Sequence, residues 1–181
     1  MNIAPIQMVD LSFRKLSVEV DFDLVPGANE VRDAHALLEG VALKTQVSFT
    51  SLDQEDQRGT PHFVILRVQI DNEGRDGEPN QRLSPYVLDI EAGAVIILAH
   101  GAERLGNPED LVAVNGPALI WGAIREQVAA MTARMPAGTV MLPSVNFHDL
   151  KQSTREKATA LTTEASPDHA AKPKRTRARK S

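Results

Sequence analysis

The sequence predicts an α+β fold in which a four-stranded antiparallel sheet is followed by one long helix and a shorter C-terminal helix. Three observations indicate this class. Four segments in succession show the apolar alternation, or the short apolar runs, that are typical of strands. One long stretch after them repeats apolar residues at helical spacing, and this periodicity fades after Leu150. We therefore expect one folded domain over residues 1–150 and a tail over residues 151–181.

The first strand is expected over residues 9–24, where apolar and polar residues alternate. The alternation slips by one residue in the middle, which would turn the second apolar set to the opposite face of the sheet. A β-bulge near Arg14 and Lys15 would absorb the slip and keep both sets on the core side. Pro26 and Gly27 are expected to end the strand. The two apolar sets are Val9, Leu11 and Phe13, then Leu16, Val18, Val20, Phe22 and Leu24.

Three further strands are expected over residues 43–51, 62–70 and 86–99. The strand at 62–70 is apolar on both sides, which is typical of a central strand that is buried on both faces. The strand at 86–99 contains Gly93, which predicts a bulge or the close approach of another group. Residues 29–40 fit either a short helix or a crossover loop that carries an apolar stripe.

The long helix is expected to begin at Pro117, where a proline does not need its backbone N–H, and to stop at Pro136. Residues 101–116 are expected to be irregular apart from a short helix from Pro108. A short helix to about residue 161, followed by disorder, is expected in the tail. The apolar stripe of the long helix consists of Ile120, Ile124, Val128, Met131 and Met135.

Charge is unevenly distributed along the chain. The net charge is −4, yet residues 1–150 carry eleven basic and twenty-one acidic residues, whereas residues 151–181 carry nine and three. This basic tail allows three interpretations: sequence-blind nucleic-acid binding that weakens with salt, association with an acidic protein surface such as the chain's own body, or simple solvation. Its basic cluster consists of Lys172, Lys174, Arg175, Arg177, Arg179 and Lys180.

The residue types that enzymes need do not form a recognisable pattern. The chain has no cysteine, so disulfides and thiolate sites are excluded. Its five histidines never occur at the i, i+4 spacing of a helical metal site, and no phosphate-binding or nucleophile motif is present. We expect no enzymatic activity, no cofactor and no metal. The N-terminus lacks a signal-peptide pattern and no apolar run could span a bilayer, which predicts a cytoplasmic protein without membrane insertion.

Four segments stand in a distinctive order: VILRV at residues 64–68, YVLDIEAGAVI at 86–96, LIWGAIRE at 119–126 and LPSVNFHDL at 142–150. In the second segment an aromatic, an acidic residue and a glycine follow at a fixed spacing, and the third segment contains an aromatic. As an ordered set, the segments resemble the third strand, the fourth strand, the main helix and the following segment of the SecB family of bacterial protein-export chaperones. The residues that carry the likeness are Tyr86, Asp89, Gly93 and Trp121.

This resemblance implies an ATP-independent holdase that binds unfolded polypeptides, in the first place preproteins for translocation, and that assembles as a homotetramer, a dimer of dimers. It also implies long apolar grooves that hold extended clients without sequence preference. Flexible aliphatic and methionine side chains suit such binding, because they repack around different clients. Candidate groove residues are Val31, Leu37, Leu38, Phe49, Trp121 and Phe147, the last three being equally compatible with an ordinary core. Candidate interface residues are Leu88, Ile90, Leu119, Ile120 and Ile124.

The family presents acidic residues on its outer sheet face to the translocation ATPase SecA, and the resemblance gives Glu19, Val87 and Asp89 as candidates for this contact. Lys15 stands where another acidic residue is expected, and the tail is basic where the family's tail is acidic. These two departures raise an alternative, a specialised SecB-like chaperone of a single client such as an antitoxin. A nucleic-acid-associated adaptor that acts through the basic tail is the second alternative.

Overall fold

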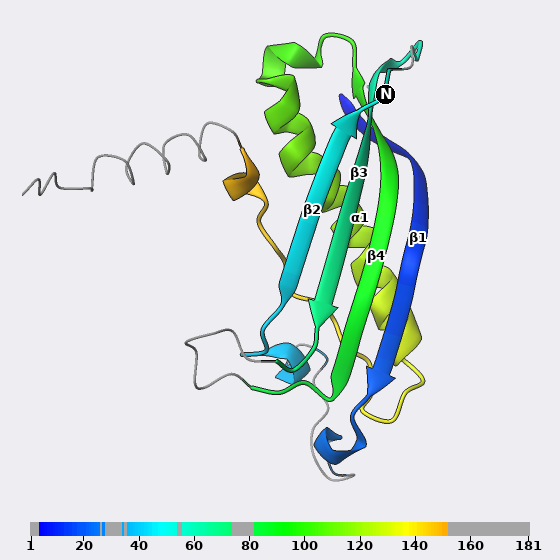
Figure 1. Ribbon diagram of the computed structural model, residues 1–181, viewed down its shortest axis with the longest axis vertical. Helices are drawn as coiled ribbons and strands as arrows, with labels where there is room; N and C mark the ends of the chain where they lie inside the picture. The colour runs from blue at the N-terminus through cyan, green and yellow to red at the C-terminus, as the bar shows by residue number, and fades with distance from the viewer. Residues whose placement is uncertain are drawn as a thin grey trace, which may run out of the picture.

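The computed structural model describes residues 4–25, 27, 34, 36–53, 56–73 and 82–151. It confirms the α+β class: a four-stranded antiparallel sheet is followed by one long helix that lies against one face of the sheet (Figure 1). The shorter helix expected after Lys151 lies outside the described residues. The elements are β1 (Ile6–Val20), η1 (Phe22–Leu24), η2 (Ala36–Leu38), β2 (Lys44–Ser51), β3 (Gly59–Ile70), β4 (Tyr86–Ala99), η3 (Ala102–Leu105), α1 (Pro108–Thr132) and η4 (His148–Leu150), where η marks a 3-10 helix.

The strands are ordered β1-β4-β3-β2, and every neighbouring pair is antiparallel. β3 and β4 are therefore central, which confirms the central position expected from the apolar residues on both sides of the third strand. β1 and β2 form the two edges. β4 has the predicted bounds, and β2 and β3 differ from theirs by one and three residues at their starts.

β1 contains two register shifts against β4 rather than one. The shift between Phe13 and Lys15 confirms the expected bulge, and an additional shift lies between Met8 and Asp10. The additional bulge moves Val9 out of the alternation and makes it an exposed residue, so the inward position predicted for it is wrong. With both bulges, the apolar residues that pack against the core are Ile6, Met8, Leu11, Phe13, Val18 and Val20.

The strand also ends earlier than predicted. β1 stops at Val20, and the Asp21 carboxylate accepts a hydrogen bond from the backbone N–H of Asp23 at 3.1 Å, which starts the 3-10 turn η1. This local cap competes with continued strand pairing. Phe22, expected on the core side, is consequently 73% exposed.

Gly93 confirms a close approach and not a bulge, because the pairing of β4 with both neighbours runs through it without a shift. A Cβ atom at this position would lie 2.9 Å from the Cζ of Phe63. The glycine therefore lets the phenyl ring of β3 lie across β4 on the open face of the sheet.

The helix prediction was wrong at its start: α1 begins at Pro108, and Pro117 lies inside it. The Asn107 side chain caps the first turn by accepting a hydrogen bond from the Glu109 N–H at 2.9 Å, and Pro108 occupies the first position, where its missing N–H costs nothing. Gly116, directly before Pro117, allows the helix to approach the sheet closely, since a Cβ there would lie 3.0 Å from the Cγ2 of Val64. Packing thus outweighs the hydrogen bond lost at Pro117.

The core lies between α1 and the inner face of the sheet. The expected stripe is confirmed for Ile120, Ile124 and Val128, which are fully buried, while the two methionines at its end are half-buried. After α1 the chain returns along the same face and buries Val140 and Leu142. Three contacts fix this return segment: the Tyr86 hydroxyl donates to the Gly138 carbonyl at 2.6 Å, the Trp121 Nε1–H donates to the Pro143 carbonyl at 3.0 Å, and Trp121 packs edge-on against Phe147.

Candidate functional site

The six candidate groove residues differ in what they offer a ligand. Leu37, Leu38, Trp121 and Phe147 are buried within the chain. Val31 lies outside the described residues. Among the described candidates only Phe49 is exposed, with 41% of its surface accessible to solvent. In this conformation a polypeptide could therefore reach Phe49, whereas the other four described side chains would first have to move.

Phe49 lies on an unprotected sheet edge. Within the described chain β2 pairs only with β3, so the backbone N–H and C=O groups that point away from β3 have no strand partner. Phe49 stands opposite Val64 on the core side, yet it stays exposed because α1 packs mainly on β4, β1 and β3. The edge thus presents a row of backbone groups beside an open phenyl ring.

The two edges of the sheet differ in how far they resist further pairing. Natural edge strands are usually protected by bulges, prolines or charged residues. β1 has two bulges and four charged side chains at Asp10, Arg14, Lys15 and Glu19. β2 keeps one register over its eight residues, lacks proline and is charged only at Lys44. As far as the described residues show, the β2 edge is therefore the better suited of the two to accept an added strand.

The outward surface of α1 is unusually apolar. No charged residue occurs between Asp110 and Arg125. Most of the interface candidates face inward, because Leu88, Ile90, Ile120 and Ile124 are buried between the helix and the sheet of the same chain. The interface candidate left on the surface is Leu119, which is 39% exposed beside the exposed positions Ala118 and Gly122. A helix that is apolar on its solvent side as well is typical of one that packs against a further partner.

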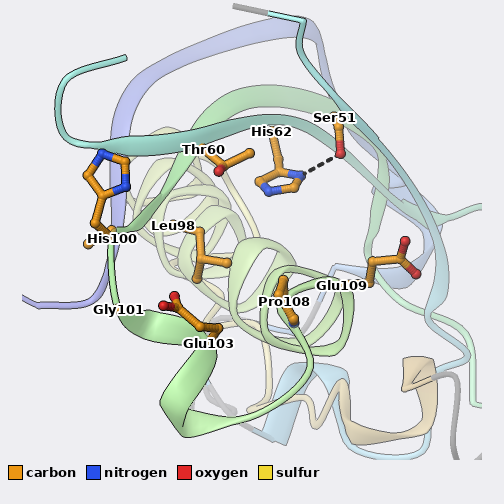
Figure 2. Close-up of a pocket in the computed structure, with 10 residues that line it drawn as sticks. Ser51, Thr60, His62, Leu98, His100, Gly101, Glu103, Pro108 and Glu109 are labelled. Carbon is orange, nitrogen blue, oxygen red and sulfur yellow. Dashed lines mark hydrogen bonds between the residues drawn. The ribbon is translucent and has the colours of Figure 1, made fainter. Parts of the chain in front are cut away.

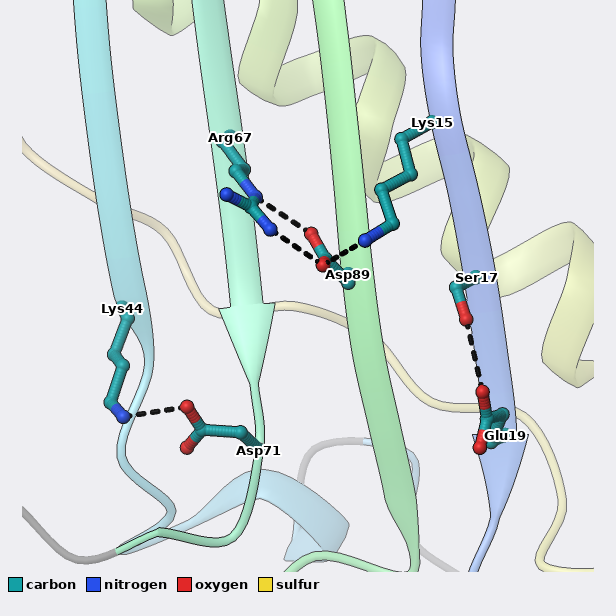
Figure 3. Close-up of polar contacts among 7 residues, drawn as sticks. All are labelled: Lys15, Ser17, Glu19, Lys44, Arg67, Asp71 and Asp89. Carbon is teal, nitrogen blue, oxygen red and sulfur yellow. Dashed lines mark hydrogen bonds and ion pairs between the residues drawn. The ribbon is translucent and has the colours of Figure 1, made fainter.

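Figure 3 shows two of the SecA-contact candidates, Glu19 and Asp89, on the sheet face opposite α1, and the third, Val87, is paired with Glu19 across the strands. Glu19 is exposed, pairs with Val87 across the strands, and accepts a hydrogen bond from the Ser17 hydroxyl at 3.3 Å. Asp89 is the neighbour of Ser17 on the same face. The structure therefore brings the three candidates together, but it surrounds one of them with cations.

Asp89 is held between two basic side chains. The Arg67 guanidinium donates to both carboxylate oxygens, at 2.8 and 2.7 Å, and Lys15 pairs with one of them. These contacts, led by the hydrogen bonds from Arg67, hold the pKa of Asp89 well below its usual range. Arg14 pairs with Glu91 at 3.0 Å one step along the face. The carboxylates at 89 and 91 are thus already neutralised within the chain.

Sequence reasoning missed a cavity of about 390 Å3 at the end of the sheet near the start of α1 (Figure 2). Its wall includes His62 of β3, which is only 5% exposed and lies within hydrogen-bonding distance of the Ser51 hydroxyl through Nδ1, at 3.2 Å. The Nε2 atom of His62 is buried and has no hydrogen-bond partner among the described residues. The lining is Ser51, Thr60, His62, Leu98, Ala99, His100, Gly101, Glu103, Pro108 and Glu109.

Burial lowers the pKa of His62 below its ordinary value of 6.5, although the charge of Glu109 partly opposes this. The unfolded chain therefore binds a proton at this residue more readily than the folded protein does. We expect the free energy of unfolding to decrease as the pH falls through 6.5 towards the lower folded pKa, and this loss to be smaller in the variant His62→Asn. Denaturant unfolding at several pH values measures it; parallel pH profiles for the two proteins would contradict the expectation.

Three further predictions concern the basic tail, membrane insertion and metal binding. The basic cluster from Lys172 to Lys180 lies outside the described residues. Within the described part of the chain, no helix is long and apolar enough to cross a membrane, and no group of three or more His, Asp or Glu side chains could hold a metal ion.

Comparisons with known proteins leave the family of the chain open. No family model matches the sequence, and no curated protein matches it. Among solved structures, a Mycobacterium tuberculosis SecB-like chaperone, Rv1957 in complex with a ChAD peptide from the Rv1956 HigA1 antitoxin, is similar with a TM-score of 0.39 and 15% sequence identity. The match covers 78% of this chain and 91% of that chain. A TM-score and an identity at this level do not assign the chain to a family.

Proposed function

We propose that this chain is an ATP-independent holdase that binds an extended segment of unfolded polypeptide along the open edge of β2. The observation that carries the proposal is the β2 edge itself, whose outward backbone groups have no strand partner among the described residues and lie beside the exposed ring of Phe49. Strand addition draws its affinity from main-chain hydrogen bonds and its selectivity from alternate side chains. Because the main-chain hydrogen bonds are the same for every sequence, such an edge can hold many clients or, with selective side-chain contacts, a single one.

Modest affinity suits this activity. Apolar contact contributes about 25 cal/mol per Å2 of buried surface before the ordering of the client is subtracted, so one phenyl ring adds only a few kcal/mol. A client held this way is released without nucleotide hydrolysis. The proposal therefore needs no cofactor and no catalytic group.

The state of Asp89 bears on the choice of client. General export through SecA would need an acidic docking surface on the outer sheet face, and Glu19 and Val87 stay available for such a contact. However, Arg67 and Lys15 already neutralise Asp89, and Arg14 neutralises Glu91. We therefore favour a specialised client over general preprotein export. We expect the chain to hold unfolded clients in the absence of SecA and to show no measurable binding to SecA.

We further propose that copies of the chain assemble through the outward surface of α1. The uncharged stretch between Asp110 and Arg125, with Leu119 at its exposed centre, supports this placement. Assembly on the helix side leaves both edges of each sheet accessible, including β2. One self-complementary α1 surface joins two copies; a homotetramer, a dimer of dimers, would need a second interface between two such pairs, and several β2 edges could then act on one client.

Removing the exposed ring from β2 should weaken client binding. We expect Phe49→Ser to raise the Kd for a permanently unfolded probe, reduced and carboxymethylated α-lactalbumin, at least tenfold, because about 1.5–3 kcal/mol of apolar contact is lost. The matched control is Phe22→Ser, since Phe22 is also exposed but lies beyond β1 in η1. Fluorescence anisotropy measures both. Equal weakening by the two substitutions would exclude the β2 edge as the binding site.

A further inference from the structure

One wall of the cavity around His62 holds a buried ring nitrogen, Nε2, that has no hydrogen-bond partner among the described residues. A neutral imidazole carries one donor and one acceptor nitrogen. When Nδ1–H donates to the Ser51 hydroxyl oxygen, the buried Nε2 is left with a free acceptor lone pair. A buried polar atom without a partner costs about 1–3 kcal/mol. In Figure 2 this nitrogen points away from Ser51, towards the side of the cavity where Leu98 and Pro108 lie. A ligand that donates there would recover the missing hydrogen bond.

The charges around the cavity select a cationic ligand. Glu103 and Glu109 both line it, and the charge of Glu109 acts on His62. The N-terminus of α1 at Pro108 contributes about half a positive charge, which the full negative charge of Glu103 alone outweighs. A metal ion is disfavoured, because the described residues offer no group of three ligands. An ammonium or guanidinium group, which only donates hydrogen bonds, fits the wall best.

The chain itself carries a cluster of ammonium and guanidinium groups in its tail, within reach of the cavity. The first turn of α1 is shared by two hollows: Pro108 and Glu109 line the His62 cavity, while Asn107 and Asp110 line a second hollow whose wall includes Lys151. The tail therefore leaves the described structure beside the cavity. The twenty residues from 152 to 171 can span up to about 70 Å. The basic cluster, Lys172 to Lys180, is thus within reach, and its charge is opposite to that of the acidic body.

We propose that the cavity lined by His62, Glu103 and Glu109 is a binding site for a basic side chain, and that its occupant is a lysine or arginine of the chain's own segment Lys172–Lys180. Tethering raises the local concentration of that segment to the millimolar range, so weak contacts suffice to hold it. The site is separate from Phe49, and its occupation is read at the His62 ring and not through client binding. Failure of this inference leaves the holdase proposal untouched.

The test uses the full-length chain and nuclear magnetic resonance of the His62 ring. In a full-length variant with the six basic residues of the cluster replaced by glutamine, the ring signals should differ from those of the wild type. A synthetic peptide of residues 171–181 should restore the wild-type position saturably. In the same background Glu103→Gln should raise the Kd of the peptide at least fivefold, because one carboxylate at the cavity is lost. Glu39→Gln, at another exposed acid, should change it less than about twofold.

Three results would overturn the proposal. Ring signals that are identical in the wild type and the glutamine variant would show that no basic side chain of the tail occupies the cavity. Equal effects of the Glu103 and Glu39 substitutions would reduce the contact to nonspecific charge attraction. Ring signals of the wild type that stay unchanged while the tail binds single-stranded RNA would assign the cluster to nucleic acid instead.

Discussion

Replacing Trp121 with alanine is expected to lower the free energy of unfolding by about 3–5 kcal/mol, a large part of the stability of a domain of this size. Trp121 is buried, packs edge-on against Phe147 with ring centroids 6.2 Å apart, and donates its Nε1–H to the Pro143 carbonyl. It thereby joins α1 to the segment after the helix, which returns along the same face of the sheet. Its loss leaves a cavity and frees that segment.

A graded series separates packing from hydrogen bonding at this position. Trp121→Phe keeps an aromatic ring against Phe147 and should cost much less than alanine, because the hydrogen bond to Pro143 contributes only about 1 kcal/mol. Denaturant unfolding followed by circular dichroism measures both variants. A loss below about 1 kcal/mol for Trp121→Ala would contradict the buried position and would return Trp121 to the groove candidates.

Replacing Leu119 with glutamate is expected to dissociate the assembly at micromolar protein concentration. The proposed interface would bury this side chain between two α1 surfaces that carry no charge from residue 111 to residue 124. A carboxylate placed there loses its water shell without a cationic partner, and in a symmetric interface each copy contributes one. The fold should survive, because Leu119 is 39% exposed within one chain.

Leu83→Glu is the matched control for this experiment. Leu83 is also an exposed leucine, but it precedes β4 and is not part of α1. Analytical ultracentrifugation of the wild type and both variants gives their masses. We expect the wild type and Leu83→Glu to sediment as the same oligomer and Leu119→Glu as a smaller species. Three equal masses would exclude the outward surface of α1 as the interface.

The strands could be predicted from the sequence because successive side chains of a strand point to opposite faces of the sheet, so that apolar and polar residues alternate with a period of two. The β1 bulge near Arg14 follows from the phase slip, and the close approach at Gly93 follows from a glycine inside an apolar strand. The start of α1 could not be found by the same reasoning. Gly116 and Pro117 are locally unfavourable in a helix, whereas the packing of Gly116 against Val64, a residue about fifty positions earlier, becomes visible only in the folded chain.

The candidate site was predictable only in part, because exposure depends on what covers a residue. Phe49 and Trp121 are similar apolar aromatics in sequence, yet one lies on an edge strand that the helix leaves open and the other lies beneath a return segment. The cavity around His62 had no local signal at all. Its wall combines residues of β2, β3, β4 and α1, and the unpartnered nitrogen appears only once these elements are assembled.

The most direct test of the holdase proposal is light scattering from a chemically unfolded, aggregation-prone enzyme diluted into buffer that contains the full-length chain and no nucleotide. We expect scattering to fall in proportion to the amount of chain and to be largely suppressed near stoichiometric amounts. Phe49→Ser should lose most of this suppression, while Phe22→Ser should keep it. Scattering that is unchanged by an excess of the folded wild-type chain would contradict the proposed function.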